Sequence, residues 1–470
     1  MNKQTLFSIV AASALLGGCS LSPNYERPAT ELPEAWSAAP AQGQAMAGER
    51  WWTVYGDATL ERLITEALAG NQDLALATAR LDEARALARI ADAELAPAVD
   101  AAFQRDRTRR SSSTATRFPG APENNNYRAQ INVSYELDLW GRLRDSAKAA
   151  RAELLATSAA RETVRIALTA QVTQSYYALV AYDAQIAATR KSLALRQDNL
   201  RLQRVRAGAG LINDFVLRQL EAEVAAAQAQ LPALERRRTG EELALGVLLG
   251  RSPRALIDEN VARSAESGQP AMPVIPAELP SSLLLRRPDV VSAEQQLIAA
   301  NARIGAARAS LFPRIGLSGY LGSESAALSN LFSGPAQIWN LGFALAQPIF
   351  QGGRLFGEIE AVQARQRQAL AQYQKTLQTA FRETHDALVA QTKAREVFDA
   401  ENARAAALGE TLRMARIRYD NGLTSQLEVL DAERNLLSAE LNRADALRAQ
   451  RAAIADVVKA LGGGWTGLQL

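Results

Sequence analysis

The chain contains one histidine and one cysteine in 470 residues, which limits the metal and nucleophilic chemistry it could perform. His385 lies next to Glu383 and Asp386, but a metal site on a helix needs ligands three or four residues away, and the residues there are of the wrong type. The sequence contains no phosphate-binding Gly-x-x-x-x-Gly-Lys loop and no nucleophile elbow. We therefore predict that the chain is not an enzyme, that it holds no metal or cofactor, and that His385 lies on a helix surface.

The single cysteine indicates covalent lipid attachment. Lys3 precedes an apolar run that ends in Leu16-Gly17-Gly18-Cys19, which is the pattern of a lipoprotein signal peptide. Residues 1–18 are predicted to be removed, and Cys19 is predicted to carry the lipid, including palmitate. Ser20 follows in place of an aspartate, which implies sorting to the outer membrane. The alternative is an ordinary secretory signal with a chance cysteine.

The composition favours closely packed long helices. Hydrophobic residues make up 48% of the chain but aromatic residues only 6%, and Ala, Leu, Gln, Arg and Glu are abundant. The 53 basic and 50 acidic residues nearly balance, so we predict no nucleic-acid partner. No run of about 20 apolar residues follows the signal peptide, and a membrane crossing would therefore have to use strands.

The second half of the chain repeats the first. Matching residues recur at an offset of 212 in most places and of 216 upstream of the strands. The matches at 212 are Gly141-Arg142-Leu143 with Gly353-Arg354-Leu355, Gly210-Leu211 with Gly422-Leu423, Glu221 with Glu433, and Gly250 with Gly462. Those at 216 are Asp73 with Asp289 and Pro97 with Pro313.

Each repeat is predicted to contain a helix, two strands, a very long helix, a tight turn and another helix. Residues 128–138 alternate strictly between apolar and polar, as a strand with one apolar face does. A soluble sandwich would show the same alternation, so the pattern favours a membrane barrel only weakly. Residues 109–127 are rich in Ser, Thr and Asn, and we predict a solvent-exposed loop there.

The long helices are predicted at about 141–206 and 353–418, where no proline interrupts the pattern. Some 65 residues at 1.5 Å each would make a rod of roughly 100 Å, which requires a coiled-coil neighbour. Helices at 213–249 and 425–461 could supply it. An open four-stranded sheet leaves backbone groups unpaired in hydrocarbon, so a membrane sheet would have to close through other copies, and three copies give about 12 strands.

The predicted organisation has six parts. They are a signal peptide at 1–18, a lipidated N-terminal equatorial segment at 19–70, a first repeat at 71–250, a proline-rich linker at 251–286, a second repeat at 287–462, and a short tail at 463–470.

Together with these features, the junction Glu136-Leu137-Asp138-Leu139-Trp140-Gly141-Arg142-Leu143 and the run Arg286-Arg287-Pro288-Asp289 resemble the TolC-like outer membrane factor family. The resemblance is strongest to its lipoprotein branch, the NodT or OprM type that serves resistance-nodulation-division pumps. It covers nearly all of the mature chain. It implies a mainly helical homotrimer with one shared 12-stranded β-barrel in the outer membrane, a periplasmic helical barrel and a mixed equatorial belt.

The resemblance also implies a conduit for drugs and toxic compounds. Its periplasmic tip would be closed until an adaptor (membrane fusion) protein and an inner-membrane pump dock on it. The tip turns that would contact the adaptor contain Gly208, Gly210, Leu211, Gly422 and Leu423.

The same resemblance assigns the gate residues. Glu428 and Asp431 match the acidic ring of the aperture, and Leu427 matches its apolar part. Arg418 and Tyr419 match the latch positions, and Asp214 is the candidate acidic latch residue, because Val216 stands where the family has an aspartate. The alternative for Glu428 and Asp431 is a pair of solvated carboxylates near a helix N-terminus.

Two other functions remain open on the sequence alone. A lipid-anchored coiled-coil scaffold without a pore would explain the long helices and Cys19, but not the strand pairs at equivalent places in both repeats. An exit channel for type I protein secretion would have the same architecture as a small-molecule duct.

Overall fold

The structure is a computed structural model that describes residues 21–29, 50–109, 111, 123–258, 260–263, 281–465 and 467. The predicted signal peptide and Cys19 lie outside these residues. The chain divides into two compact units. One comprises residues 1–29, 80–158 and 292–374, and the other comprises residues 30–79, 159–291 and 375–470.

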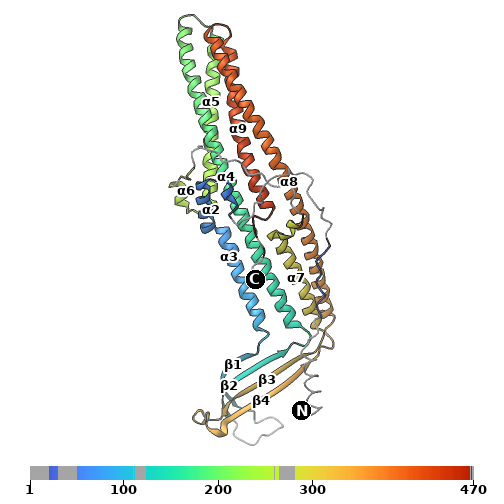
Figure 1. Ribbon diagram of the computed structural model, residues 1–470. Helices are drawn as coiled ribbons and strands as arrows, with labels where there is room; N and C mark the ends of the chain where they lie inside the picture. Colours follow the sequence, from blue (N-terminus) through green and yellow to red (C-terminus); the bar gives the residue numbers. More distant parts are fainter. Residues whose placement is uncertain are drawn as a thin grey trace. The chain divides into compact units, whose positions relative to one another are not determined.

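The same five elements follow one another twice (Figure 1). The first set is α3 (Gln72–Ala93), β1 (Ala98–Arg109), β2 (Glu123–Leu137), α4 (Arg142–Gly208) and α5 (Asp214–Leu248). The second set is α7 (Pro288–Ala309), β3 (Arg314–Ser325), β4 (Gln337–Ala346), α8 (Arg354–Asp420) and α9 (Gln426–Ala460). The predicted element order is confirmed, while the predicted domain boundaries stay a prediction.

The two longest helices have the same length and begin in the same way. α4 and α8 each contain 67 residues. Gly141 and Gly353 directly precede them with φ values of +80° and +84°, a region that glycine enters without the penalty a Cβ imposes. The recurring Gly-Arg-Leu of the sequence is therefore the strand-to-helix junction of each repeat.

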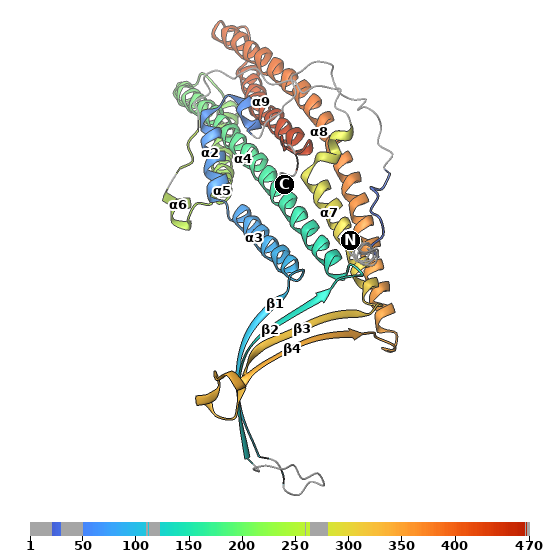
Figure 2. The same ribbon diagram turned by 60° about the horizontal axis from the view of Figure 1, so that its bottom comes forward.

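The four strands of the first unit form one antiparallel sheet in the order β1-β2-β3-β4 (Figure 2). The register pairs Val99 with Val133, and Ile131 with Leu321. Facing residues of neighbouring strands point to the same side, so one face of the sheet is apolar and exposed, as the alternation predicted. It carries Val99, Phe103, Ile131, Val133, Leu317, Leu321, Trp339, Leu341, Phe343 and Leu345.

The predicted loop at 109–127 was wrong at its C-terminal end. β2 begins at Glu123, and its first five residues pair with Arg105 to Arg109 of β1. Asn124, Asn125 and Asn126 have low intrinsic strand preference, but pairing with an existing strand overrides it.

A core in the second unit forms where the short N-terminal helices meet the long ones. η1 (Trp51–Tyr55) and α2 (Ala58–Gly70) pack their apolar side chains against α4, α5 and α9. Trp51, Leu60 and Ile64 contribute from these short helices, and Tyr176 and Ile454 are among their buried partners. The Tyr55 hydroxyl donates to the Arg451 carbonyl at 2.7 Å, which fixes the core to α9.

Within the described residues, no helix combines the length and apolar composition required to cross a membrane.

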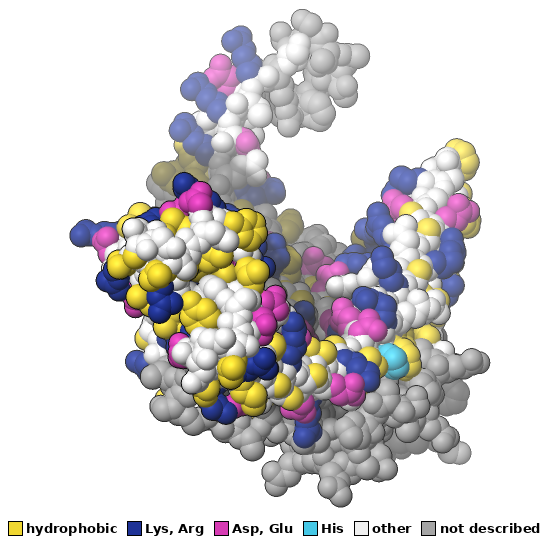
Figure 3. All heavy atoms as spheres, turned by 90° about the horizontal axis from the view of Figure 1, so that it is seen from above, with side chains coloured by type: hydrophobic (Ala, Val, Ile, Leu, Met, Phe, Trp, Pro, Cys, Tyr) yellow, Lys and Arg dark blue, Asp and Glu magenta, His cyan; other side chains and the backbone are white. Residues whose placement is uncertain are grey.

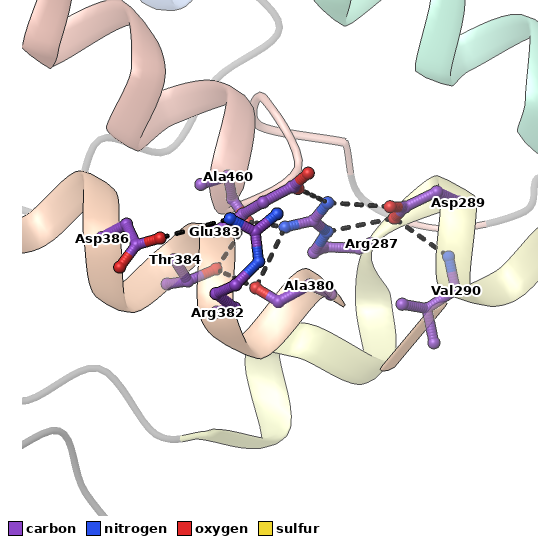
Figure 4. A network of polar contacts seen from close by, with 9 residues as sticks. All are labelled: Arg287, Asp289, Val290, Ala380, Arg382, Glu383, Thr384, Asp386 and Ala460. Carbon is purple, nitrogen blue, oxygen red and sulfur yellow. Dashed lines mark hydrogen bonds and ion pairs between the residues drawn. The ribbon is translucent and has the colours of Figure 1, made fainter. Parts of the chain in front are cut away.

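Each repeat is closed by a bond between the start of its first helix and the end of its last helix. In the first repeat, Asn71 Nδ2 donates to the Leu248 carbonyl at 3.0 Å. In the second repeat, Arg287 Nη1 donates to the Ala460 carbonyl at 2.9 Å (Figure 4). The donors Asn71 and Arg287 are 216 residues apart, and the acceptors Leu248 and Ala460 are 212 residues apart, which are the two offsets of the duplication. The closing bond therefore occurs at equivalent places in both repeats but is made by a different side chain in each.

The second closing bond is part of a larger network (Figure 4). The Arg287 side chain is only 7% exposed and forms ion pairs with Asp289 at 2.7 Å and Glu383 at 2.8 Å. Its Nη1 also donates to the Ala380 carbonyl at 3.3 Å. One buried guanidinium therefore joins the segment before α7 to both α8 and α9.

We expect Arg287→Ala to lower the free energy of unfolding by about 3–5 kcal/mol, because it leaves two carboxylates and two carbonyls without their cation. Arg382→Ala is the matched control, since its 3.4 Å pair with Asp386 is exposed and should contribute less than about 1 kcal/mol. Thermal denaturation followed by circular dichroism measures both. Equal midpoints for the two variants would contradict the role assigned to Arg287.

Candidate functional site: the helical tip

The tip of the second unit is built from two equivalent turns. Gly210 and Gly422 lie two residues after the last residues of α4 and α8, with φ values of +74° and +70°. The amide of Leu211 donates to the Arg206 carbonyl at 2.9 Å, and that of Leu423 to the Arg418 carbonyl at 2.8 Å. This is the helix-ending geometry that requires a left-handed residue, hence glycine. Both leucines are about 70% exposed, so each turn presents an apolar side chain to solvent.

The helices that follow the turns start at equivalent residues but are capped differently. The Asn213 side chain accepts from the Val216 amide at 3.0 Å and caps α5. Ser425 occupies the equivalent place before α9 but makes no side-chain capping bond.

The predicted aperture residues lie on the first turns of α9. Leu427, Glu428 and Asp431 are exposed, whereas Gln426 and Val429 on the opposite side are buried. Asp431 accepts from the Asn435 side chain at 3.1 Å. Asp431 follows Leu427 by four positions and Glu428 by three, so it lies on the same side of the helix as both of them. Their role as an aperture stays a prediction.

Tyr419 is the predicted latch residue that connects two helices. Its hydroxyl accepts from Gln203 Nε2 at 2.9 Å and from Arg206 Nη1 at 3.2 Å. Gln203 is almost fully buried. The ring of Tyr419 packs with Leu412 and Val429. Tyr419 therefore links the end of α8 to the end of α4 within one chain.

The other two latch candidates do not join this link in the single chain. The Arg418 side chain is exposed and forms no side-chain hydrogen bond among the described residues. Asp214 pairs only with Arg218 of its own helix at 3.5 Å. No sequence pattern indicated Gln203 or Arg206 as partners of Tyr419, because the contact between α4 and α8 depends on how each helix is rotated about its axis.

Below the tip turns, the same ion pair occurs once in each repeat. Arg204 Nη2 lies 3.0 Å from Glu221 and ties α4 to α5, and Arg416 Nη2 lies 2.8 Å from Glu433 and ties α8 to α9. Hydrogen bonding by Arg204 lowers the pKa of the Glu221 carboxyl below its ordinary value. The offset of 212 relates both members of the pairs, so the repeat itself could have predicted the second pair from the first.

A further charged link crosses between the repeats. Glu223 of α5 accepts from the buried Arg196 of α4 at 3.0 Å and from Arg434 of α9 at 2.7 Å. No sequence pattern indicated this link either. Together with the Tyr419 contact, it connects the two helix pairs of one chain near the tip.

Comparison with known proteins decides the family. The family model described as outer membrane efflux protein matches residues 63–251 and 279–463. The chain belongs to this outer membrane efflux family.

Curated relatives match over nearly their whole length. The chain is 36% identical to the outer membrane protein OprJ of Pseudomonas aeruginosa, covering 97% of this chain and 95% of OprJ. It is 33% identical to the cation efflux system protein CusC of Escherichia coli, covering 96% of each. Solved structures agree, as shown by the CmeC outer membrane channel of Campylobacter jejuni, with a TM-score of 0.90, 27% identity and 95% coverage of both chains.

The open state of the MtrE outer membrane channel of Neisseria gonorrhoeae also matches, with a TM-score of 0.84 and 30% identity over 95% of this chain and 98% of MtrE. The predicted family and fold class are thereby confirmed. This efflux protein is located in the outer membrane and serves as the exit component of an efflux system, as the sequence predicted. Its relatives are channel and efflux proteins.

The face of the efflux protein seen in Figure 3 carries mixed charge. In the view of Figure 3, Arg and Lys side chains lie among Asp and Glu side chains over the visible helices. Within the described part of the chain, no group of three or more His, Cys, Asp or Glu residues is arranged to hold a metal ion.

We expect Tyr419→Phe to loosen the tip, because the ring still packs but the hydroxyl that accepts from Gln203 and Arg206 is lost. Amide hydrogen exchange at residues 203–211 and 417–425 should become several-fold faster. Tyr182→Phe is the matched control, since its hydroxyl forms no hydrogen bond among the described residues. Unchanged exchange in Tyr419→Phe would show that the hydrogen bonds of the Tyr419 hydroxyl do not stabilise the tip.

Proposed function

We propose that three copies of this outer membrane efflux protein form one closed duct that passively conducts small molecules out of the periplasm. The sheet supports this proposal most directly. β1 and β4 are its outer strands, and each has one edge that no other described strand pairs. In hydrocarbon every unpaired backbone group costs several kcal/mol, so closure through neighbouring copies is strongly favoured. Three copies supply about 12 strands, within the range of membrane barrels.

The polar face of the sheet supports a water-filled interior. Asp100, Gln104, Asn132, Gln130 and Ser318 alternate with the exposed apolar residues and so lie on the opposite side. If the apolar side contacts lipid, these polar side chains line the duct, as in barrels that hold water. We propose no catalytic step and no cofactor for the chain. Transport energy would come from an inner-membrane pump, joined to the duct by a periplasmic adaptor that contacts Leu211 and Leu423 at the tip turns.

The tip is proposed as the gate of the duct. Copies arranged around one axis would bring Glu428 and Asp431 of each chain close together, with Leu427 forming an apolar constriction. Crowded carboxylates attract cations, and this arrangement would restrict both the size and the charge of what passes. Tyr419, with its bonds to α4, would hold the closed form, and Arg418 and Asp214 would act between neighbouring copies.

The cargo is proposed to be selected by the pump. Curated relatives include one named for toluene efflux, 34% identical over 97% of this chain, as well as the cation efflux protein CusC. Related exit components thus bear the names of chemically different cargoes. A small-molecule system is favoured over type I protein secretion, because these relatives are named for efflux. Lipid on Cys19 would add an anchor to the barrel.

Single-channel conductance in planar bilayers tests the gate. The parent should show small, cation-selective steps, and Glu428→Ala with Asp431→Ala should raise the conductance several-fold or abolish the selectivity, because the carboxylates are removed. The control is Glu396→Ala with Glu410→Ala, two exposed carboxylates of α8 away from the tip. Equal conductance in all three proteins would place the gate elsewhere, and no conductance in any of them would contradict the duct.

A further inference from the structure

Three arginines of β1 lie on the apolar side of the sheet. Arg105, Arg107 and Arg109 continue the alternation that begins with Val99 and Phe103. Residues two apart on a strand point to the same side and lie about 6.6 Å apart. The strand therefore changes from an apolar row to a basic row without changing the side it presents.

The basic row begins where the apolar band ends. On β2 the same side of the sheet is apolar or aromatic from Leu137 to Ala129, a length of about 27 Å. This is close to the roughly 25 Å apolar band of outer-membrane barrels. Arg105 faces Tyr127, one pleat beyond Ala129, at the level where aromatic residues of such barrels meet the lipid headgroups.

The end of the sheet with the arginines is the end away from the helices. β1 starts after α3 and β2 leads into α4, so Arg109 and Glu123 lie at the hairpin end of these two strands. If the helices are periplasmic, as in the proposed function on which this step rests, the hairpin end reaches the outer leaflet.

Arg105, Arg107 and Arg109 have only one acidic partner among the described residues. Arg107 pairs with Glu123 at 2.7 Å, while the guanidinium of Arg105 lies 5.5 Å from the centre of the Tyr127 ring. The Arg109 side chain forms no hydrogen bond or ion pair among the described residues. Three positive charges thus face one negative charge.

Among the described residues, the neighbours of this row on the same side add no further charge. Those at the same level on the next two strands are neutral: Asn125, Ser323 and Ser325. The other charged residues of this region, Asp106, Arg128 and Glu324, occupy the alternate positions and lie on the opposite side of the sheet. The excess charge therefore belongs to the side that faces lipid.

We propose that Arg105, Arg107 and Arg109 bind the phosphate groups of the phosphorylated glycolipid in the outer leaflet. A guanidinium binds phosphate through two parallel hydrogen bonds, and it gains more from this at the edge of a low-dielectric region than in water. Their spacing lets neighbouring arginines contact separate phosphates of one headgroup or of adjacent lipids. The Tyr127 ring beneath Arg105 would contact the first sugar or acyl groups.

Native mass spectrometry of the purified protein with bisphosphorylated lipid A tests this proposal. The variant is Arg105→Gln, Arg107→Gln, Arg109→Gln, and its conservative counterpart carries lysine at all three positions. The control removes the same charge from exposed arginines of α8, through Arg365→Gln, Arg367→Gln and Arg395→Gln. Dephosphorylated lipid A and phosphatidylglycerol serve as comparison lipids.

We expect the glutamine variant to retain at least five-fold less bisphosphorylated lipid A than the parent and the α8 control. The lysine variant should fall between them, and dephosphorylated lipid A should bind weakly to every protein. Equal retention by the parent and the glutamine variant would overturn the proposal, as would retention of phosphatidylglycerol as strong as that of lipid A.

Folding and membrane insertion are checked separately by single-channel conductance of each variant. A glutamine variant that conducts like the parent but fails to lose lipid A contradicts only the lipid site. Absence of conductance in the parent contradicts the duct itself. If the triple variant does not fold, Arg109→Gln alone should still reduce lipid A retention, because Arg109 has no partner in the described chain to lose.

Discussion

The open edges of the sheet are the constraint on which the rest of the molecule depends. A four-stranded sheet with an exposed apolar face belongs in hydrocarbon, and hydrocarbon offers no partner to the outer edges of β1 and β4. The proposed closure by further copies would satisfy those edges and enclose the polar face.

The two repeats share the positions of their structural contacts more often than the residue types that make those contacts. Gly210 and Gly422 make the same turn, whereas Asn71 and Arg287 make the same closing bond with different chemistry. The neutral bond joins only the two ends of its repeat. The charged bond also reaches α8 through Glu383. The charged bond thus holds the middle of α8 to the end of α9 opposite its tip.

Much of the fold could be predicted from local signals. Glycines before α4 and α8, proline-free helical stretches and the period-two pattern of 128–138 are properties of the chain itself, and they gave the correct element order. The extension of β2 to Glu123 was missed because pairing with β1 outweighs the low strand preference of asparagine. The partners of Tyr419 and Glu223 were missed because contacts between helices depend on rotations that no local pattern encodes. The aperture residues came from family resemblance, since exposed carboxylates near a helix start look alike whether or not they line a channel.

The number of copies in the membrane-inserted protein tests the central claim most directly. Native mass spectrometry of the chain released from lipid nanodiscs, with the same preparation measured for conductance, reports both assembly and function. We predict a single species of three copies in preparations that conduct. A conducting preparation that contains only single chains, or one in which three copies form but the edges of β1 and β4 exchange their amide hydrogens freely, would contradict closure of the sheet between copies.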